Sequence, residues 1–174
     1  MNYIKDIKLE IDKDTFNGII EIPKGTNKKY ELNDPKFDKV ECVRKVVGKY
    51  PFYYGCFPHT YAGDKDPLDM ILLSNKKRNI LDVVEVLPFA VIKTIDNNEV
   101  DDKIICIAKD EWIKDLRPLV KKMLKFLHTY KGKNANTVID NRTYDATEAI
   151  RLIKDAKLAY DVKVGTANTI LSVF

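Results

Sequence analysis

The segment DKDPLD at residues 64–69 places three aspartates, Asp64, Asp66 and Asp69, within six positions. Carboxylates this close repel one another unless cations or solvent lie between them. Calcium binding of the EF-hand kind is excluded, because that loop needs Gly at its sixth position and Glu at its twelfth. Counted from Asp64, these positions hold Asp69 and Asn75. The segment alone fits either a solvated turn or a site for another metal.

A second acidic segment, TIDNNEVDDK at residues 94–103, supplies Asp96, Glu99, Asp101 and Asp102. Each acidic segment adjoins an apolar run that predicts a strand, and two turns between strands can face the same mouth of a small barrel. Carboxylates without His or Cys favour hard cations, Mg²⁺ or Mn²⁺. Several carboxylates together suit a site in which two metal ions share a bridging oxygen and lower its pKa.

A phosphate-type substrate would also need cationic or hydroxyl partners on its far side. The candidates are Lys29, Arg44, Lys103, Tyr130 and Lys131. Each of these side chains alone is most simply interpreted as a solvated surface residue. The tyrosines of YPFYYG (50–55) are more often core or rim aromatics than ligands. The combination with the acidic segments, rather than any one residue, indicates an anion-binding site.

Short segments rich in Val, Ile and Tyr and bounded by Gly, Pro, Asn or Asp predict antiparallel strands in the first two thirds of the chain. The expected strands are residues 15–23, 29–32, 39–47, 68–74, 82–96 and 102–109. From Leu116 to Tyr130 the apolar spacing becomes helical, with Asp115 as the expected N-cap. A second helix is expected from the capping-box pair Asp145 and Glu148 to Tyr160. The pattern predicts an α+β fold: a small closed barrel with two main C-terminal helices packed outside it.

The composition indicates one globular domain over residues 1–174, with 45% hydrophobic and 32% charged residues. The chain has no apolar run near the ~18 residues of a membrane span, and its start lacks a secretory pattern, so a cytoplasmic location is expected. A net charge of +4 permits an anionic partner without identifying one. Three dispersed cysteines without CxxC spacing predict buried thiols rather than a zinc site or disulfides.

Taken together, these segments resemble soluble family I inorganic pyrophosphatases, enzymes that split diphosphate into two phosphates with Mg²⁺. The resemblance runs from about Gly18 to Lys131 and rests on six ordered segments. They are EIP (21–23), KYE (29–31), YPFYYG (50–55), DKDPLD (64–69), the D-x4-D-x-K spacing of Asp96, Asp101 and Lys103, and HTYK (128–131). Six ordered matches are far more specific than a single D-x-D.

The resemblance implies a role for each matching residue. Three to four Mg²⁺ ions, or Mn²⁺ in their place, would be held with substrate by Glu21, Glu31, Asp64, Asp69, Asp96 and Asp101. Asp66 would be the general base for a metal-bridged water, with Tyr54 hydrogen-bonded close by. The substrate phosphates would be bound by Lys29, Arg44, Tyr50, Lys103, Tyr130 and Lys131. The implied fold is a closed five-stranded barrel of OB type, in agreement with the strand pattern.

Two positions depart from the family pattern. Arg44 lies six residues before Tyr50, whereas bacterial members usually place their arginine further upstream, where Cys42 stands here. Either the connecting loop is shorter, or a neighbour such as Lys45 replaces the arginine. Lys65 stands where the family has Gly, Ser, Asn or Asp, and it is expected to point away from the metals toward solvent.

The matches end at Lys131 and therefore allow two assemblies, a hexamer and a dimer. The short chain favours the hexamer of bacterial members. A rival function is a non-catalytic OB-type barrel that binds nucleic acid. Carboxylates at its mouth would repel a phosphate backbone, so neither a nucleic-acid nor a membrane partner is expected. A further alternative is a hydrolase of the same fold that acts on nucleoside polyphosphates.

Overall fold

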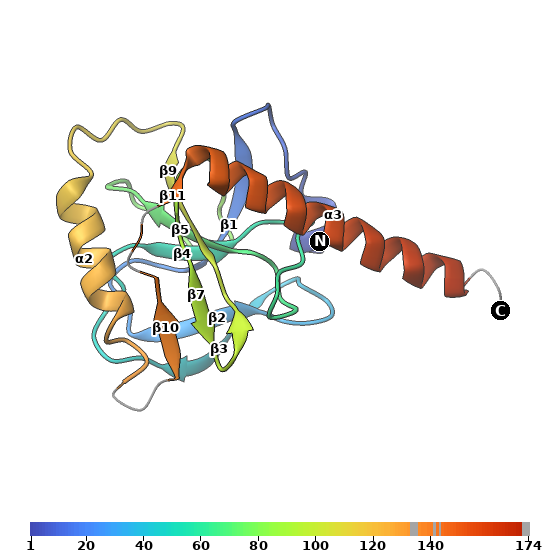
Figure 1. Cartoon of the computed structure of the whole chain (residues 1–174), viewed down its shortest axis with the longest axis horizontal. Coiled ribbons are helices and arrows are strands. Elements are labelled where there is room, and N and C mark those ends of the chain that lie inside the picture. The colour runs from blue at the N-terminus through green and yellow to red at the C-terminus, as the bar shows by residue number, and fades with distance from the viewer. Residues whose placement is uncertain (133–135, 141, 143, 172–174) are drawn as a thin grey trace.

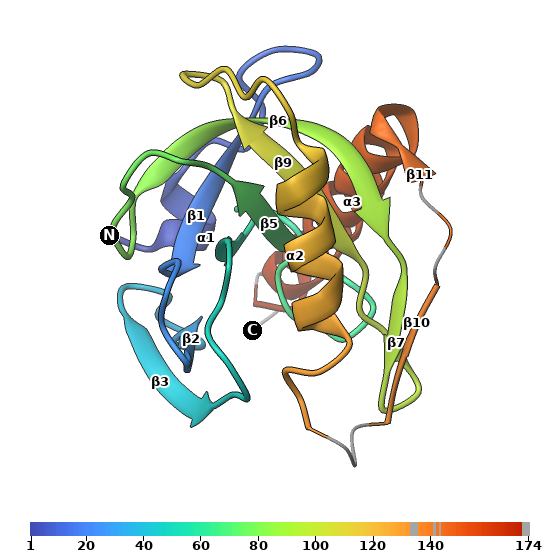
Figure 2. The same ribbon diagram turned by 90° about the vertical axis from the view of Figure 1, so that its left-hand side faces the viewer.

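A closed five-stranded barrel forms the body of the protein. The computed structural model describes residues 1–132, 136–140, 142 and 144–171, with side chains up to Gly165. The barrel strands are β1 (Phe16–Ile22), β4 (Tyr53–Cys56), β5 (Asp69–Leu73), β9 (Lys103–Ala108) and β6 (Val83–Ile92). They pair in the order β1-β4-β5-β9-β6, and β6 pairs back with β1 to close the barrel (Figure 2). The predicted α+β fold with a closed barrel is therefore confirmed.

One barrel pairing brings the two acidic segments to the same end of the barrel. β5 and β9 are parallel and in a register that sets Asp69 opposite Lys103. The prediction of antiparallel strands throughout was wrong for this pair, because β6 lies between them in sequence and returns the chain to its starting end. Parallel strands begin at the same edge of a sheet, so the residues preceding β9 lie beside those at the start of β5.

Strand β5 buries both of its faces, and each face shares a hydrophobic cluster with one of the two longer helices. Met70 and Leu72 of β5 belong to the cluster that includes Ala149 and Ile153 of α3 (Ala146–Leu171). The alternate residues Ile71 and Leu73 belong to the cluster of α2 (Arg117–Leu127). A strand buried on both faces is continuously apolar, as the MILL sequence of β5 is.

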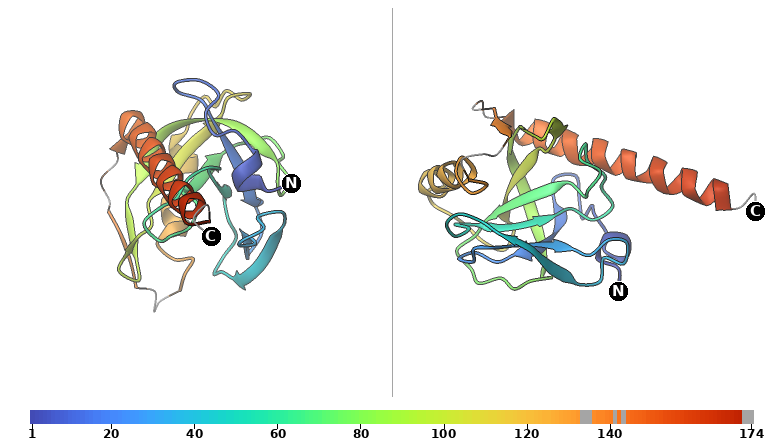
Figure 3. Two further views of the ribbon diagram at one scale, coloured as in Figure 1. Left: turned by 90° about the vertical axis from the view of Figure 1, so that its right-hand side faces the viewer. Right: turned by 90° about the horizontal axis from the view of Figure 1, so that it is seen from below.

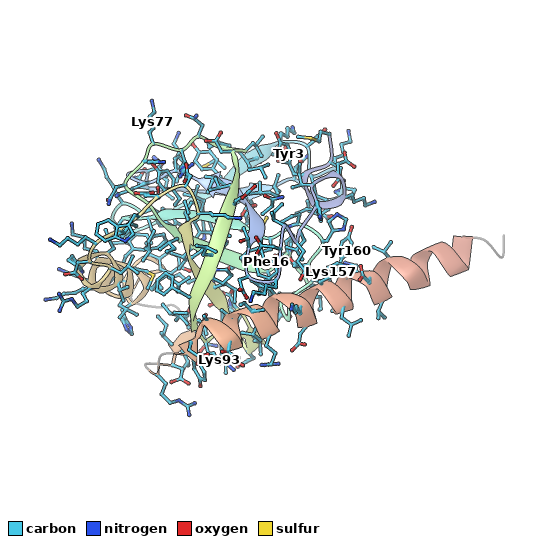
Figure 4. The ribbon with its side chains drawn as sticks, turned by 90° about the horizontal axis from the view of Figure 1, so that it is seen from above. Tyr3, Phe16, Lys77, Lys93, Lys157 and Tyr160 are labelled. Carbon is cyan, nitrogen blue, oxygen red and sulfur yellow. The ribbon has the colours of Figure 1, made fainter. Side chains whose placement is uncertain are left out.

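The second helix begins where the sequence predicts, because Asp145 accepts a hydrogen bond from the Glu148 backbone N–H (3.1 Å). The expectation of Asp115 as the N-cap of α2 was wrong: Leu116 is the N-cap and makes no side-chain capping bond, while Asp115, one residue earlier, accepts a hydrogen bond from the Arg117 N–H (3.0 Å). α3 continues past the predicted end at Tyr160 and projects beyond the body (Figures 1 and 3). Tyr160 lies on the side of α3 that faces the body, where its ring contacts His59 (Figure 4). Among the described helices, none is long and apolar enough to cross a membrane.

Two small sheets flank the barrel and were not predicted as separate units. The hairpin of β2 (Lys28–Leu32) and β3 (Val40–Lys45) lies outside it, because β4, which the sequence pattern missed, pairs with β1 instead. The predicted strand 82–96 divides into β6 and β7 (Thr94–Asp96), and β7 pairs with β8 (Glu99–Val100) and β10 (Thr137–Ile139). The remaining elements are α1 (Tyr3–Asp6) and β11 (Tyr144–Asp145), which extends the barrel sheet along β6.

Candidate active site

A cleft of about 1030 Å³ lies between the β2–β3 hairpin, the loop that precedes β5, and the segment from β7 to the start of β9. All seven carboxyl groups that the sequence singled out as metal ligands or base line it. They are Glu21, Glu31, Asp64, Asp66, Asp69, Asp96 and Asp101. The parallel pairing of β5 and β9 and the outward β2–β3 hairpin thus bring together residues that are up to 80 positions apart.

Lys103 occupies the centre of the acidic group. Its ammonium nitrogen lies 2.8 Å from Asp69 Oδ2 and 2.7 Å from Asp101 Oδ1, and the residue is only 2% exposed. Burial alone would lower the pKa of Lys103, but the two carboxylates raise it above its ordinary value. Lys103 is therefore a fixed positive charge at neutral pH.

The two carboxylates that share Lys103 differ in their pKa. Burial opposes the ionisation of both, but for Asp69 the charge and hydrogen bond of Lys103 and the hydrogen bond of the Tyr54 hydroxyl lower the pKa. For Asp101, burial and the neighbouring Asp69 charge raise the pKa to about 7, although Lys103 opposes this. One lysine thus does not fully neutralise the pair, and a further cation would be stabilised here.

Glu21 is a buried acid with no ion-pair partner among the described residues. Its Oε1 accepts a hydrogen bond from the Leu32 backbone N–H (2.7 Å), and the residue is 7% exposed. Burial raises the pKa of Glu21 to about 8; the Leu32 N–H opposes this, and the nearby Asp69 and Glu31 charges add to it. A carboxyl in this position is protonated near neutral pH unless a cation binds beside it.

The loop that carries Asp64 and Asp66 is a compact turn. The Asp66 N–H donates to Asp64 Oδ1 (3.2 Å), and the Lys65 N–H donates to the Ala62 carbonyl (3.1 Å). Burial, followed by the charge of Asp64, raises the pKa of Asp66 above its ordinary value. Asp66 is nevertheless exposed to the cleft, so its carboxylate is free to accept a proton from a bound water.

The predicted cationic side chains lie mainly on the opposite wall. Lys29 and Arg44 are paired in the β2–β3 register, and both line the cleft. The Arg44 guanidinium lies 5.9 Å from the centre of the Tyr130 ring. Lys131 contacts Asp96 (Nζ to Oδ2, 2.6 Å). Arg44 lines the cleft whereas Lys45, the alternative that the sequence left open, does not.

Two tyrosines take positions that the sequence did not specify. Tyr54 was expected beside Asp66, but its hydroxyl donates to Asp69. Burial, followed by the Asp69 charge, raises the pKa of Tyr54 far above its ordinary value, so the hydroxyl stays protonated. Tyr50 is 2% exposed, packs against Phe126 with ring centres 4.7 Å apart, and lies behind the cleft wall instead of lining it.

The sequence gave no sign of two features of the site: a threonine that bonds to a lining carboxylate, and a thiol that lines the cleft itself. Thr137 of β10 donates its hydroxyl to Asp96 Oδ1 (2.6 Å), and thereby orients that carboxylate. Thr137 lies beyond Lys131, the last residue of the six ordered segments found in the sequence, and no local signal marks it. The thiol of Cys56, expected only to be buried, lines the cleft among the carboxylates; a thiol inside an apolar strand gives no sign of such a position.

The donor chemistry of the cleft fits divalent cations. Carboxylate oxygens are the ligands that Mg²⁺ prefers, and the raised pKa values of Glu21 and Asp101 mark negative charge that the lysines leave uncompensated. In the part of the chain that the structure describes, however, no three Asp, Glu, His or Cys side chains are arranged to enclose an ion. Lys103 and Lys131 instead bond to the oxygens. Ion binding would therefore require small shifts of these ammonium groups.

Comparison with known proteins gives a consistent result. A family model described as inorganic pyrophosphatase matches residues 18–161. The inorganic pyrophosphatase of Sulfolobus acidocaldarius is 35% identical over 129 residues, which are 68% of this chain and 75% of that protein. That of Methanosarcina acetivorans is 32% identical over 154 residues, 82% and 90% of the two chains. The crystal structure of an inorganic pyrophosphatase from Neisseria gonorrhoeae superposes with a TM-score of 0.79 at 27% identity, covering 90% of this chain and 98% of that one.

Proposed function

Because the chain belongs to the inorganic pyrophosphatase family, we propose that it hydrolyses inorganic diphosphate to two phosphates with Mg²⁺ as its cofactor. The observation that supports this reaction is one cleft lined by seven carboxyl groups together with Lys29, Arg44 and Lys131. Carboxyl groups alone would repel diphosphate, and lysines alone would bind any anion. Their presence in the same cleft suits a substrate that enters together with divalent cations.

The cations would be held mainly by the acidic wall of the cleft, through Glu21, Asp64, Asp69, Asp96 and Asp101. Glu31 would contribute a further ligand from the β2–β3 hairpin. Bound Mg²⁺ would offset the charge of diphosphate and lower the pKa of the attacking water. Tyr54 and Thr137 act on the ligands: the Tyr54 hydroxyl fixes Asp69, and the Thr137 hydroxyl fixes Asp96. Lys103 keeps Asp69 and Asp101 at a constant separation.

The remaining residues of the cleft would act on the substrate. Asp66, exposed and with a raised pKa, is suited to take the proton of the attacking water. Lys29 and Arg44 of the β2–β3 hairpin would bind one phosphate group, and Tyr130 and Lys131 would bind the other. Cationic side chains placed at both ends of diphosphate stabilise the charge that develops on the leaving phosphate.

The direct test is phosphate release from diphosphate by the purified protein, with and without Mg²⁺ and with Mn²⁺ in its place. Rapid release that depends on the metal is expected, together with inhibition by Ca²⁺ and fluoride. ATP, assayed in parallel, should be a much poorer substrate. Intact diphosphate in the presence of Mg²⁺ would refute the proposal, and preferential cleavage of ATP would favour the nucleoside polyphosphate alternative.

Asp66→Asn tests the role of the base. Without a proton acceptor, kcat should fall by roughly 10²- to 10⁴-fold, the usual contribution of general base catalysis. Mg²⁺ affinity, measured by isothermal titration calorimetry, should change little, because Asp66 is not a proposed ligand. Asp14→Asn, at an exposed acid far from the cleft, is the matched control and should retain full activity. A variant that loses Mg²⁺ binding together with activity would make Asp66 a ligand instead.

We also propose a cytoplasmic homo-oligomer, a hexamer in preference to a dimer, without nucleic-acid or membrane partners. The support is the likeness of this short chain to bacterial members of the family and its mildly basic, globular composition. Light scattering coupled to size exclusion gives the mass directly: about six times the 20.1 kDa protomer is expected. A particle of twice the protomer mass would favour the dimer.

A further inference from the structure

The two acidic segments touch each other at a contact that the proposed reaction does not use. Gly63, directly before the first aspartate of the signature loop, packs on Val100 of β8. A Cβ atom on Gly63 would lie 3.0 Å from the Val100 carbonyl oxygen and 3.1 Å from the Val100 Cβ. Both separations are shorter than ordinary van der Waals contact. With the backbones of Gly63 and Val100 in these positions, only glycine fits at position 63.

The partners in this contact are the immediate chain neighbours of two proposed metal ligands. Gly63 precedes Asp64, and Val100 precedes Asp101. The carbonyl that Gly63 approaches belongs to the same peptide unit as the Asp101 N–H, which donates to the Thr94 carbonyl (2.9 Å). Because a peptide unit is planar and rigid, displacement of the Val100 carbonyl moves the backbone of Asp101 with it.

Lys65 adds a second contact between the same segments. Its backbone has a φ of 74°, and its side chain, 73% exposed, extends to Glu99 of β8 (Nζ to Oε1, 3.8 Å). The side chain is therefore largely in solvent and does not line the cleft, as alternation along the loop predicts, although its partner Glu99 does line it. An exposed ion pair of this length stabilises weakly. Lys65 is therefore a minor link, and the packing of Gly63 on Val100 is the closer contact.

We propose that Gly63 is a positioning residue that sets the separation between Asp64 and Asp101, and thereby the affinity of the acidic wall for Mg²⁺. The inference rests on the proposed function, since it takes these two aspartates as ligands. A larger residue at position 63 forces the neighbouring backbone to move by a few tenths of an ångström. β8 would move in preference to the barrel, because Val100 is 53% exposed and Glu99 is exposed as well.

Gly63 is required for space and not for backbone conformation, which makes the test simple. Its φ lies outside the left-handed region, so Gly63→Ala introduces a methyl group without backbone strain. Apparent Mg²⁺ affinity, measured by calorimetry without substrate, should weaken roughly 10-fold, as changes in the groups that orient metal ligands commonly do. At saturating Mg²⁺, the KM for diphosphate should return to within about twofold of the wild-type value.

Gly165→Ala is the matched control, because a Cβ at this helical glycine meets nothing within 4 Å. It should bind Mg²⁺ like the wild type. Gly63→Val should weaken Mg²⁺ binding further than Gly63→Ala, since its side chain is larger. Lys65→Gly, which suits the positive φ, should change the affinity by less than about threefold.

The outcomes separate this inference from the proposed function. If the wild-type protein binds no Mg²⁺ and leaves diphosphate intact, the proposed function fails. If the wild type does both and Gly63→Ala binds Mg²⁺ equally well, only the positioning role fails. A melting temperature of metal-free Gly63→Ala within about 2 °C of wild type is expected, because Gly63 contacts an exposed hairpin whose displacement affects stability little. A large loss of melting temperature would assign the effect to folding and overturn the inference.

Discussion

The two walls of the cleft carry similar charges in different surroundings. On the barrel wall, the side chains of Lys103 and Asp101 are 3% and 12% exposed, and each charge depends on its neighbour. On the wall formed by the β2–β3 hairpin, the side chains of Lys29 and Glu31 contact each other but are 28% and 45% exposed. The interaction between charges is strong where water is excluded and weak where solvent screens it.

This difference assigns different tasks to the two walls. A buried network of charges keeps its geometry because any change leaves an unpaired charge in the protein interior. Such a network suits metal ions, which need fixed ligands. An exposed hairpin with partly free cations suits a substrate that must enter and leave. The hairpin also forms a sheet of its own, apart from the barrel sheet.

Replacement of Lys103 by Met should give the largest loss of stability. Without the ammonium group, Asp69 and Asp101 remain buried beside each other with no cation between them. Removal of one partner from a buried charge network costs about 3–5 kcal/mol. Urea unfolding of the metal-free protein measures this loss, and added Mg²⁺ should recover part of it, since the ion binds only the folded protein.

Lys29→Met is the control on the hairpin wall. Its ion pair with Glu31 is partly screened, so the free energy of unfolding should change by less than about 1 kcal/mol. Equal losses of unfolding free energy in Lys103→Met and Lys29→Met would show that the charges of the two walls are equally screened by solvent. Wild-type stability of Lys103→Met would lead to the same conclusion.

The buried acid Glu21 sharpens the comparison through pH. Its pKa of about 8 in the folded protein exceeds the ordinary value of 4.5, so the folded state binds more protons than the unfolded state between these values. The stability of the metal-free protein should therefore decrease as pH rises from about 5 to 8, by roughly 2–3 kcal/mol. Asp101, with a pKa of about 7, acts in the same direction.

Urea unfolding in EDTA at pH 5, 6, 7 and 8 measures this dependence. Glu21→Gln keeps an oxygen to accept the Leu32 N–H but has no charge to bury, so its stability should vary much less over the same range. Saturating Mg²⁺ should also flatten the wild-type curve, because the cation stabilises the ionised carboxyl groups. A wild-type protein that becomes more stable from pH 5 to 8 in EDTA would contradict the buried, protonated state of Glu21.

Most barrel strands could be predicted from the sequence because each depends on a local pattern. The convergence of the acidic segments was instead inferred from the barrel, in which two turns can face the same mouth. Apolar runs bounded by turn residues marked four of the five barrel strands. Tyr53–Cys56 was missed, since a four-residue aromatic segment has no alternation to identify it. The parallel pairing of β5 with β9 was missed as well, because the direction of pairing follows from the path of the whole chain.

Details of the site depended on tertiary contacts that no spacing encodes. The bond from Tyr54 to Asp69 and the burial of Tyr50 both follow from the way β4 enters the barrel. Thr137 reaches Asp96 only because β10 pairs with β7. The metal, substrate and base roles of the site residues stay predictions, as does the single domain over residues 1–174.

The smallest expected effect distinguishes Arg44 from Lys45 on the hairpin wall. Arg44 lines the cleft beside Tyr130, whereas Lys45 lies at the end of β3 and does not line it. Arg44→Ala should raise the KM for diphosphate roughly 10-fold, the effect of about one lost charge-assisted hydrogen bond, with unchanged thermal stability. Lys45→Ala, matched in exposure and in the loss of one charge, should leave KM within about twofold. Steady-state kinetics at saturating Mg²⁺ decide between them: a raised KM in Lys45→Ala alone would show that Lys45 has taken the place of the family arginine.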